Sequence, residues 1–160
     1  MEKDHRRIIY LVIPLIAFLA TNSLAIERKK FGIGVIAGNP DAITGKYMMQ
    51  NGNAIDAGFG WKTKGDNEYT IYGDYLFYKY DLIKVSRGKL PLYFGGGARY
   101  TTYSEEENKE DEFGIRIPVG IEYLFEKPSL GVFLEFVPVL NLTPDTKFEF
   151  GTGIGIRFFF

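Results

Sequence analysis

Apolar and polar residues alternate with a period of two along the C-terminal part of the chain. From Phe113 to Phe125 every odd-numbered position is apolar, while the even-numbered positions hold glycine, arginine, proline, glutamate and a single leucine. The segments 130–143 and 147–160 show the same alternation. Successive side chains of a β-strand point to opposite faces, so this period is typical of strands. The pattern predicts three neighbouring strands, each with one apolar and one polar face.

Weaker alternation extends this interpretation to the rest of the chain. We expect eight strands, an even number that suits an antiparallel up-and-down transmembrane β-barrel. The expected strands span residues 31–38, 43–50, 54–62, 67–83, 89–103, 112–126, 130–143 and 147–160. The predicted fold class is therefore all-β.

Two features of the predicted strands and turns are specific enough to test. Asn51-Gly52 favours a type I′ hairpin turn, because both residue types accept positive φ angles. Pro118 and Pro138 lie inside strongly patterned strands, yet proline has no N–H to donate to a ladder. We expect a bulge or a locally open ladder at these two prolines. The longest connection is expected at 104–111.

The placement of glycine indicates which face of the barrel is the inside. Most of the 19 glycines share the face of the charged residues, and only Gly45, Gly73 and Gly96 fall on the apolar face. Glycine weakens a strand, but the narrow interior of an eight-stranded barrel needs small residues beside large ones. The charged face is therefore predicted to line the lumen, and the apolar face to contact lipid.

Residues 1–25 have the features of a cleaved signal peptide. Basic residues precede an apolar run over 8–20, and Ser23 and Ala25 supply the small residues of a cleavage site. The run is too short to cross a bilayer of roughly 30 Å as a helix. We expect export and cleavage, which leave residues 26–160 as the barrel domain.

Nine charged residues are predicted to form a network inside the barrel. They are Lys46, Asp56, Asp74, Arg99, Arg116, Glu122, Glu135, Glu149 and Arg157. Charges in so narrow a space must be paired, because an isolated buried charge costs several kcal/mol or more. The network is either a selectivity lining or proton path, or a salt-bridged plug. The plug is favoured, because eight strands leave little room for an aqueous channel.

The inventory of reactive side chains argues against an enzyme. The only histidine, His5, lies in the predicted signal peptide, and the chain has no cysteine. Ser–His and Cys–His nucleophilic sites and histidine-liganded metal sites are therefore excluded from the mature chain. We predict no catalysis, no cofactor and no metal. The near balance of 19 basic and 20 acidic residues also predicts no nucleic-acid partner.

One exposed feature has a distinct composition, an acidic loop near the middle of the chain. Its acidic residues are Glu105, Glu106, Glu107, Glu110 and Asp111. Carboxylates suit Ca²⁺ or Mg²⁺, which could bridge lipopolysaccharide, and the loop could also contact a surface partner. A solvated loop kept open by like-charge repulsion is the simpler interpretation.

The last six residues, 155–160, include Gly155, Phe158 and the terminal Phe160. This ending resembles the closing strand of bacterial outer-membrane β-barrels. In that class the last strand is a signal read by the barrel-assembly machinery, so the same role is implied here. Residues 31–160 as a whole resemble the small eight-stranded barrels of the OmpA-transmembrane and OmpX type. They look closest to an uncharacterised single-domain family, through the opening at 31–40 and the segments 75–82 and 137–146. The resemblance implies the fold and a Gram-negative outer-membrane location, but no catalytic or binding residue.

These expectations combine into one leading hypothesis and two alternatives. The leading hypothesis is an integral outer-membrane β-barrel with a filled, charge-paired lumen and both termini in the periplasm. Its role would be structural or surface-interacting, through extracellular loops, with membrane lipid and lipopolysaccharide around it and the surface partner unknown. The alternatives are a small pore, or a soluble periplasmic lipocalin-like carrier with its apolar face turned inward around a ligand.

Overall fold

The computed structural model describes residues 29–62, 68–104 and 109–160, and the predicted signal peptide lies outside these residues. Alternating sequence produces strands throughout the described ranges. They are β1 (Phe31–Asn39), β2 (Asp41–Met48), β3 (Ala54–Lys62), β4 (Glu68–Lys79), β5 (Leu92–Tyr103), β6 (Glu112–Arg116), β7 (Val119–Leu124), β8 (Leu130–Thr143) and β9 (Lys147–Phe159). None of the described residues belongs to a helix long and apolar enough to cross a membrane.

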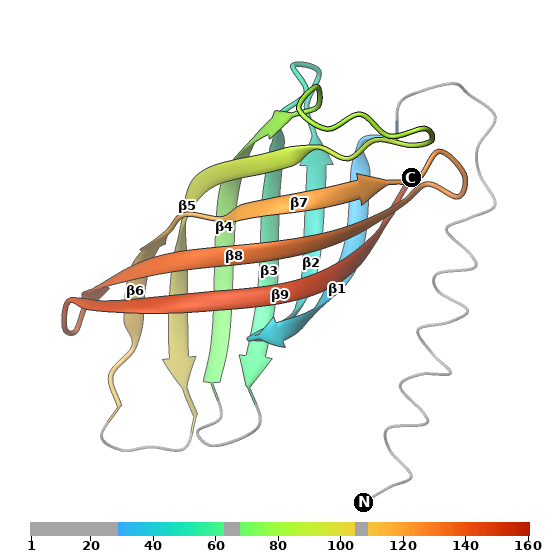
Figure 1. Ribbon diagram of the computed structural model, residues 1–160. Coiled ribbons are helices and arrows are strands. Elements are labelled where there is room, and N and C mark those ends of the chain that lie inside the picture. Colours follow the sequence, from blue (N-terminus) through green and yellow to red (C-terminus); the bar gives the residue numbers. More distant parts are fainter. Residues whose placement is uncertain (1–28, 63–67, 105–108) are drawn as a thin grey trace, which may run out of the picture.

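The strands close into an antiparallel ring, as Figure 1 shows. Strands β6 and β7 both lie between β5 and β8, so together they fill one of eight positions around the ring. The ring closes between the first and last strands. There the amide of Phe160 donates to the carbonyl of Phe31 at 2.8 Å. The prediction of an all-β, eight-stranded antiparallel barrel is confirmed.

The two faces of the wall differ as the alternation predicted. On β8 the apolar Leu134 is 58% exposed on the outside, whereas the next residue, Glu135, is 7% exposed in the lumen. A Cβ added to Gly45, Gly73 or Gly96 would meet nothing within 4 Å, so these three glycines face outward. The lipocalin-like alternative needs the apolar face inside, and the structure contradicts it.

The strand that contains Pro118 is interrupted, which confirms the expected open ladder. The strand ends at Arg116 and resumes at Val119, because Pro118 has no N–H to donate to a neighbour. The register does not slip across this gap, since Arg116 lies opposite Val139 and Val119 opposite Phe136. The amide of Ile117 donates to the carbonyl of Pro138 at 2.9 Å, so the two prolines are indeed near neighbours.

Two predictions about the connections are wrong. The hairpin at Asn51-Gly52 exists, but only Gly52 has a positive φ, of 84°, so the turn is not type I′. The amide of Gly52 donates to the carbonyl of Met49, as in a type I turn followed by a left-handed glycine. The connection 80–91 is longer than 104–111, because β4 ends at Lys79 and β5 begins only at Leu92.

The barrel has two distinct ends. We call the end that carries the start of β1, the close of β9 and the connections 49–53, 80–91 and 125–129 the terminal end, and the opposite one the loop end. A small cluster of buried side chains, Ala54, Leu76, Tyr78 and Tyr93, fills the lumen near the terminal end. Beyond this cluster the buried lumen side chains are mainly polar and charged, with a few apolar ones such as Phe133 and Val139 among them.

Candidate functional site

The innermost part of the charged lumen is a dry cluster around Glu122. The carboxylate of Glu122 lies 3.1 Å from Lys46 Nζ and 3.3 Å from an Arg157 guanidinium nitrogen, and the side chains of all three are fully buried. The hydroxyl of Tyr78 donates to the same carboxylate at 2.6 Å. Arg157 also lies 3.0 Å from Asp56. Two cations and two carboxylates therefore neutralise one another away from water.

A second cluster surrounds Arg116, farther toward the loop end. Its guanidinium lies 3.0 Å from Asp74 and 3.4 Å from Glu135. The hydroxyl of Tyr93 donates to Glu135 at 2.8 Å. The ring of Tyr72 lies beneath the guanidinium, with 3.8 Å between the Arg116 Cζ and the ring centre, which is a cation–π contact. This cluster has one cation between two carboxylates.

A third cluster lies at the loop end around Arg99 and is partly open to water. Arg99 pairs with Glu149, and it donates to the Asn141 side chain at 3.0 Å. Asn141 in turn donates to Glu112 at 2.7 Å. The Glu149 side chain is 29% exposed and also contacts Lys147 at 3.0 Å. Of the three charged clusters, the one around Glu122 is thus the driest and the one at the loop end is the wettest.

The structure places the nine predicted lumen residues in these three clusters. Apart from the tyrosines that contact them, the clusters have four members that sequence reasoning missed, Thr44, Glu112, Asn141 and Lys147. The signal that could have found three of them was strand phase, because the inward-facing positions of their strands include Thr44, Glu112 and Asn141. Thr44 was overlooked because it carries no charge, although it accepts from Arg157 at 2.9 Å and donates to Asp56 at 2.7 Å.

The lumen holds one small cavity that can be located among the described residues. It has a volume of about 40 Å³ and lies among Tyr72, Arg99, Arg116 and Glu135, on the loop-end side of the second cluster. A space of this size holds a few water molecules at most. The Glu122 cluster separates it from the terminal end, so side chains interrupt any path along the barrel axis.

The acidic loop is only partly described. Glu105, Glu106 and Glu107 lie outside the described residues, while Glu110 and Asp111 are exposed at the loop end. Tyr100 donates a hydrogen bond to Asp111, and this bond holds the pKa of the Asp111 carboxyl below its ordinary value. In the described part of the chain no group of three acidic or histidine side chains is arranged to hold a metal ion.

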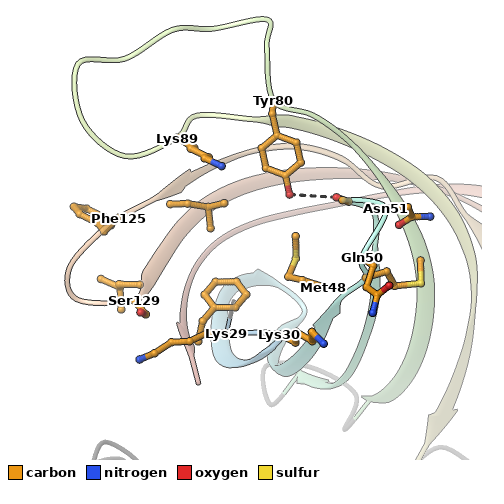
Figure 2. Close-up of a pocket in the computed structure, with 14 residues that line it drawn as sticks. Lys29, Lys30, Met48, Gln50, Asn51, Tyr80, Lys89, Phe125 and Ser129 are labelled. Carbon is orange, nitrogen blue, oxygen red and sulfur yellow. Dashed lines mark hydrogen bonds between the residues drawn. The ribbon is translucent and has the colours of Figure 1, made fainter. Parts of the chain in front are cut away.

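The terminal end carries a much larger cavity, of about 840 Å³. Figure 2 shows it as a cup with Tyr80 and Lys89 on one side, Lys29 and Lys30 on the opposite side and Met48 between them. The hydroxyl of Tyr80 donates to the carbonyl of Gly52 at 3.2 Å across the rim. Sequence patterning did not predict this cup, because it is built from chain segments between strands.

Solved structures with the same fold are transmembrane β-barrels. The N-terminal β-barrel domain of OprF from Pseudomonas aeruginosa matches with a TM-score of 0.64 and 14% identity, covering 82% of this chain and 96% of that one. A de novo designed transmembrane β-barrel matches with a TM-score of 0.52 and 19% identity, over 86% and 100%. Neisserial surface protein A (NspA) matches with a TM-score of 0.51 and 13% identity, over 82% and 94%. At these identities the likeness shows the fold, that of a small eight-stranded outer-membrane β-barrel.

The remaining comparisons concern sequence. A search of curated proteins found no match. The family model described as "Protein of unknown function (DUF3996)" matches residues 22–160. This match covers the whole barrel, so the chain belongs to the DUF3996 family.

Proposed function

We propose that this chain is an integral outer-membrane protein that works without catalysis, as a structural or surface-interacting barrel. In this proposal both termini lie in the periplasm, which makes the terminal end periplasmic and the loop end extracellular. Any specificity for a surface partner then belongs to the loop-end connections, including the acidic residues at 105–111. Membrane lipid and lipopolysaccharide surround the wall.

The observation that carries the proposal is the apolar outer wall. Large apolar side chains are exposed on strands around the ring, among them Ile33, Ile71, Ile115, Leu134 and Ile156. A soluble protein rarely exposes so much contiguous apolar surface. A closed barrel satisfies its backbone hydrogen bonds internally, which is what a strand-built protein needs in lipid.

The filled lumen supports a structural role over a pore. Glu122, Lys46 and Arg157 occupy the lumen in full burial, and the cavity found beside the second cluster has a volume of only about 40 Å³. An ion would have to break this network to pass, and breaking a buried ion pair costs about 3–5 kcal/mol. We therefore expect a barrel that does not conduct at rest.

Membrane fractionation combined with gel mobility tests the proposal. The mature chain is expected in the outer-membrane fraction, with a band that shifts between unboiled and boiled samples, because closed barrels stay folded in SDS. Purified protein in planar bilayers is expected to show no stepwise conductance. Recovery as soluble periplasmic protein would contradict membrane insertion, and regular conductance steps would favour the small pore.

Protease accessibility tests the orientation. A cleavage site inserted after Lys109 is expected to be cut in intact cells, since it lies in the 104–111 connection at the loop end. The matched control carries the same site after Ser86, in the 80–91 connection at the terminal end, and should be cut only after permeabilisation. The opposite pattern would place the termini outside.

Deletion of Phe160 tests the role of the C-terminal strand in assembly. Phe160 exchanges backbone hydrogen bonds with Phe31 at the seam that closes the ring. We expect its removal to reduce the folded, heat-shifting fraction in cells. Phe125→Ala is a matched control, because Phe125 is an exposed aromatic residue at the same end but lies outside the closing strand. Equal assembly of the Phe160 deletion and the unchanged chain would refute the signal role.

A further inference from the structure

The cup at the terminal end has a composition that the proposed function does not use. Three of the residues that line it, Lys29, Lys30 and Lys89, are cationic, and none of the described residues that line it is acidic. Met48, Met49, Leu124, Leu130 and Phe159 give the cup an apolar part, and Gln50, Asn51 and Ser129 add uncharged polar groups to its lining. Cationic groups beside apolar side chains are complementary to a molecule that has an anionic head and an apolar tail.

The walls of the cup are fixed by backbone hydrogen bonds. The amide of Met48 donates to the carbonyl of Lys30 at 2.7 Å, which ties the start of the barrel to the end of β2. Lys89 and Leu124 exchange two backbone hydrogen bonds, at 3.0 and 2.8 Å. The backbones of Lys30 and Lys89 are therefore held in place, and these walls of the cup are formed before any ligand arrives, which lowers the entropy cost of binding.

The three lysines have ammonium groups available for a ligand. Within the described residues none of them forms an ion pair. Lys29 lies 5.5 Å from the ring centre of Phe158, and Lys89 lies 5.6 Å from that of Tyr80. Such contacts stabilise a cation only weakly at exposed positions. A carboxylate or phosphate would form stronger, charge-assisted hydrogen bonds with the same groups.

We propose that this cup binds a single-chain amphiphile with an anionic head, its carboxylate or phosphate at Lys29, Lys30 and Lys89 and its chain on the apolar part. The volume of about 840 Å³ falls within the range of roughly 300–1,000 Å³ that small-molecule sites occupy. The two methionines suit a flexible chain, because the methionine side chain adapts to irregular shapes. A protein partner fits less well, since protein interfaces need a broad surface rather than one enclosed cup.

Lysine footprinting in a bilayer tests the proposal. The mature chain is placed in zwitterionic phosphatidylcholine nanodiscs, and amine acylation at each lysine is measured by mass spectrometry, with and without dodecyl phosphate. At a dodecyl phosphate concentration of about ten times its Kd, some nine-tenths of the sites are filled. Acylation of Lys29, Lys30 and Lys89 should then slow by about tenfold. Lys84 and Lys127 are internal controls, because they are exposed at the same end but do not line the cup.

Related probes separate the parts of the proposal. Dodecanoate replaces the phosphate head by a carboxylate, and protection by either probe or both supports the proposal and identifies the head group. Dodecanol, which has no charge, and inorganic phosphate, which has no chain, should each protect far less. Equal protection by inorganic phosphate would overturn the amphiphile, and equal protection of Lys84 and Lys127 would show adsorption to the disc surface instead.

Two variants complete the test. Lys30→Gln combined with Lys89→Gln should weaken dodecyl phosphate binding at least about tenfold, as the loss of one charge-assisted hydrogen bond of roughly 1.5–3 kcal/mol implies. Lys84→Gln combined with Lys127→Gln removes the same charge from the same end and should bind normally. Unchanged binding in the first pair would overturn the site. Low reactivity of the three lysines before any probe is added would also overturn it, because the cup would then already be covered.

Discussion

The inner and outer faces of the barrel wall are built from neighbouring residues but have opposite polarity. On β7 and β8, Ile121 lies opposite Leu134, and the next pair along is Glu122 opposite Phe133. Leu134 is 58% exposed on the outside, whereas Glu122 is fully buried in the lumen. A step of one residue therefore moves a side chain from the apolar outer surface to a dry ionic network.

This difference shows where sequence changes are tolerated. On the outer face a side chain needs chiefly to be apolar, because its neighbours in the wall are other apolar side chains, as where the rings of Phe136 and Phe150 stack. On the inner face each charged group needs named partners, since an unpaired buried charge costs several kcal/mol. Loss of a single inner carboxylate should therefore cost more than most changes on the outer face.

The largest expected effect is that of Glu122→Gln. The substitution keeps the size of the side chain but leaves Lys46 and one side of Arg157 without their carboxylate in a dry interior. We expect a loss of about 3–5 kcal/mol in the free energy of unfolding. Urea titration of the barrel in lipid vesicles, followed by the unboiled gel shift, measures it.

The matched control for this prediction is Lys46→Met combined with Glu122→Gln. This pair removes both the cation and the carboxylate, so it should recover part of the lost stability. Exposed ion pairs typically contribute less than about 1 kcal/mol to stability. A loss this small for Glu122→Gln alone would contradict a dry lumen.

The next effect concerns the outer face. Leu134→Arg places a charge on the exposed apolar wall between Ile121 and Ile154. If this wall lies in the hydrocarbon core, the change should cost about 2–4 kcal/mol in lipid vesicles. Leu82→Arg is the control, because Leu82 is 65% exposed in the 80–91 connection, outside the strands. Equal losses for the two variants would show that the wall is not embedded in lipid.

The sequence predicted the two faces well because their signal is local and repeated. A period of two assigned the inward phase to Glu122, Glu135 and Arg157 and the outward phase to Leu134, and a single residue of error would have reversed every position. It did not predict how the inward charges group into three clusters. That grouping depends on which strands lie across the lumen, as when Lys46 of β2 meets Glu122 of β7.

The connections were predicted less well, for a different physical reason. The segment 80–91 contains apolar residues such as Leu82 and Ile83 that imitate a strand, yet it leaves the ladder after Lys79. Gly88 adopts a positive φ of 70° there, where an added Cβ would lie 2.5 Å from the carbonyl oxygen of Leu124. The cup at the terminal end depends on this irregular path, so alternation could not reveal it.

Paired glycine substitutions compare the two faces directly. An added Cβ at Gly155 would overlap the Phe133 ring, whereas one at Gly73 would meet nothing within 4 Å. Phe133 cannot move freely, because the Arg157 guanidinium lies 4.4 Å from its ring centre. Gly155→Ala should therefore cost about 1–3 kcal/mol through overpacking. Gly73→Ala should stabilise by about 0.4–1 kcal/mol, because it restricts the unfolded chain.

The same urea titration of both glycine variants decides the comparison. Opposite signs for the two shifts in midpoint support the assignment of inner and outer faces. If Gly73→Ala were as destabilising as Gly155→Ala, the sheet itself would be intolerant of side chains and the glycine argument would fail.

The smallest expected effect is that of Glu149→Gln, at the wet end of the same lumen. Glu149 pairs with Arg99, as Glu122 pairs with Arg157, but its side chain is 29% exposed. Arg99 would keep Glu112, at 3.6 Å, and its hydrogen bond to Asn141. Water also reaches this end, so we expect a loss of no more than about 1 kcal/mol in the free energy of unfolding.

Salt dependence separates this case from the dry cluster. The ionic part of the Glu149 contribution to stability should shrink in 1 M salt, where the screening length is about 3 Å. The cost of Glu122→Gln should hardly change, because ions do not reach a buried pair. Parallel titrations at low and high salt measure both effects. Equal salt sensitivity of the two variants would mean that water and ions enter the lumen along its whole length, and the plug would then have to be regarded as a channel lining.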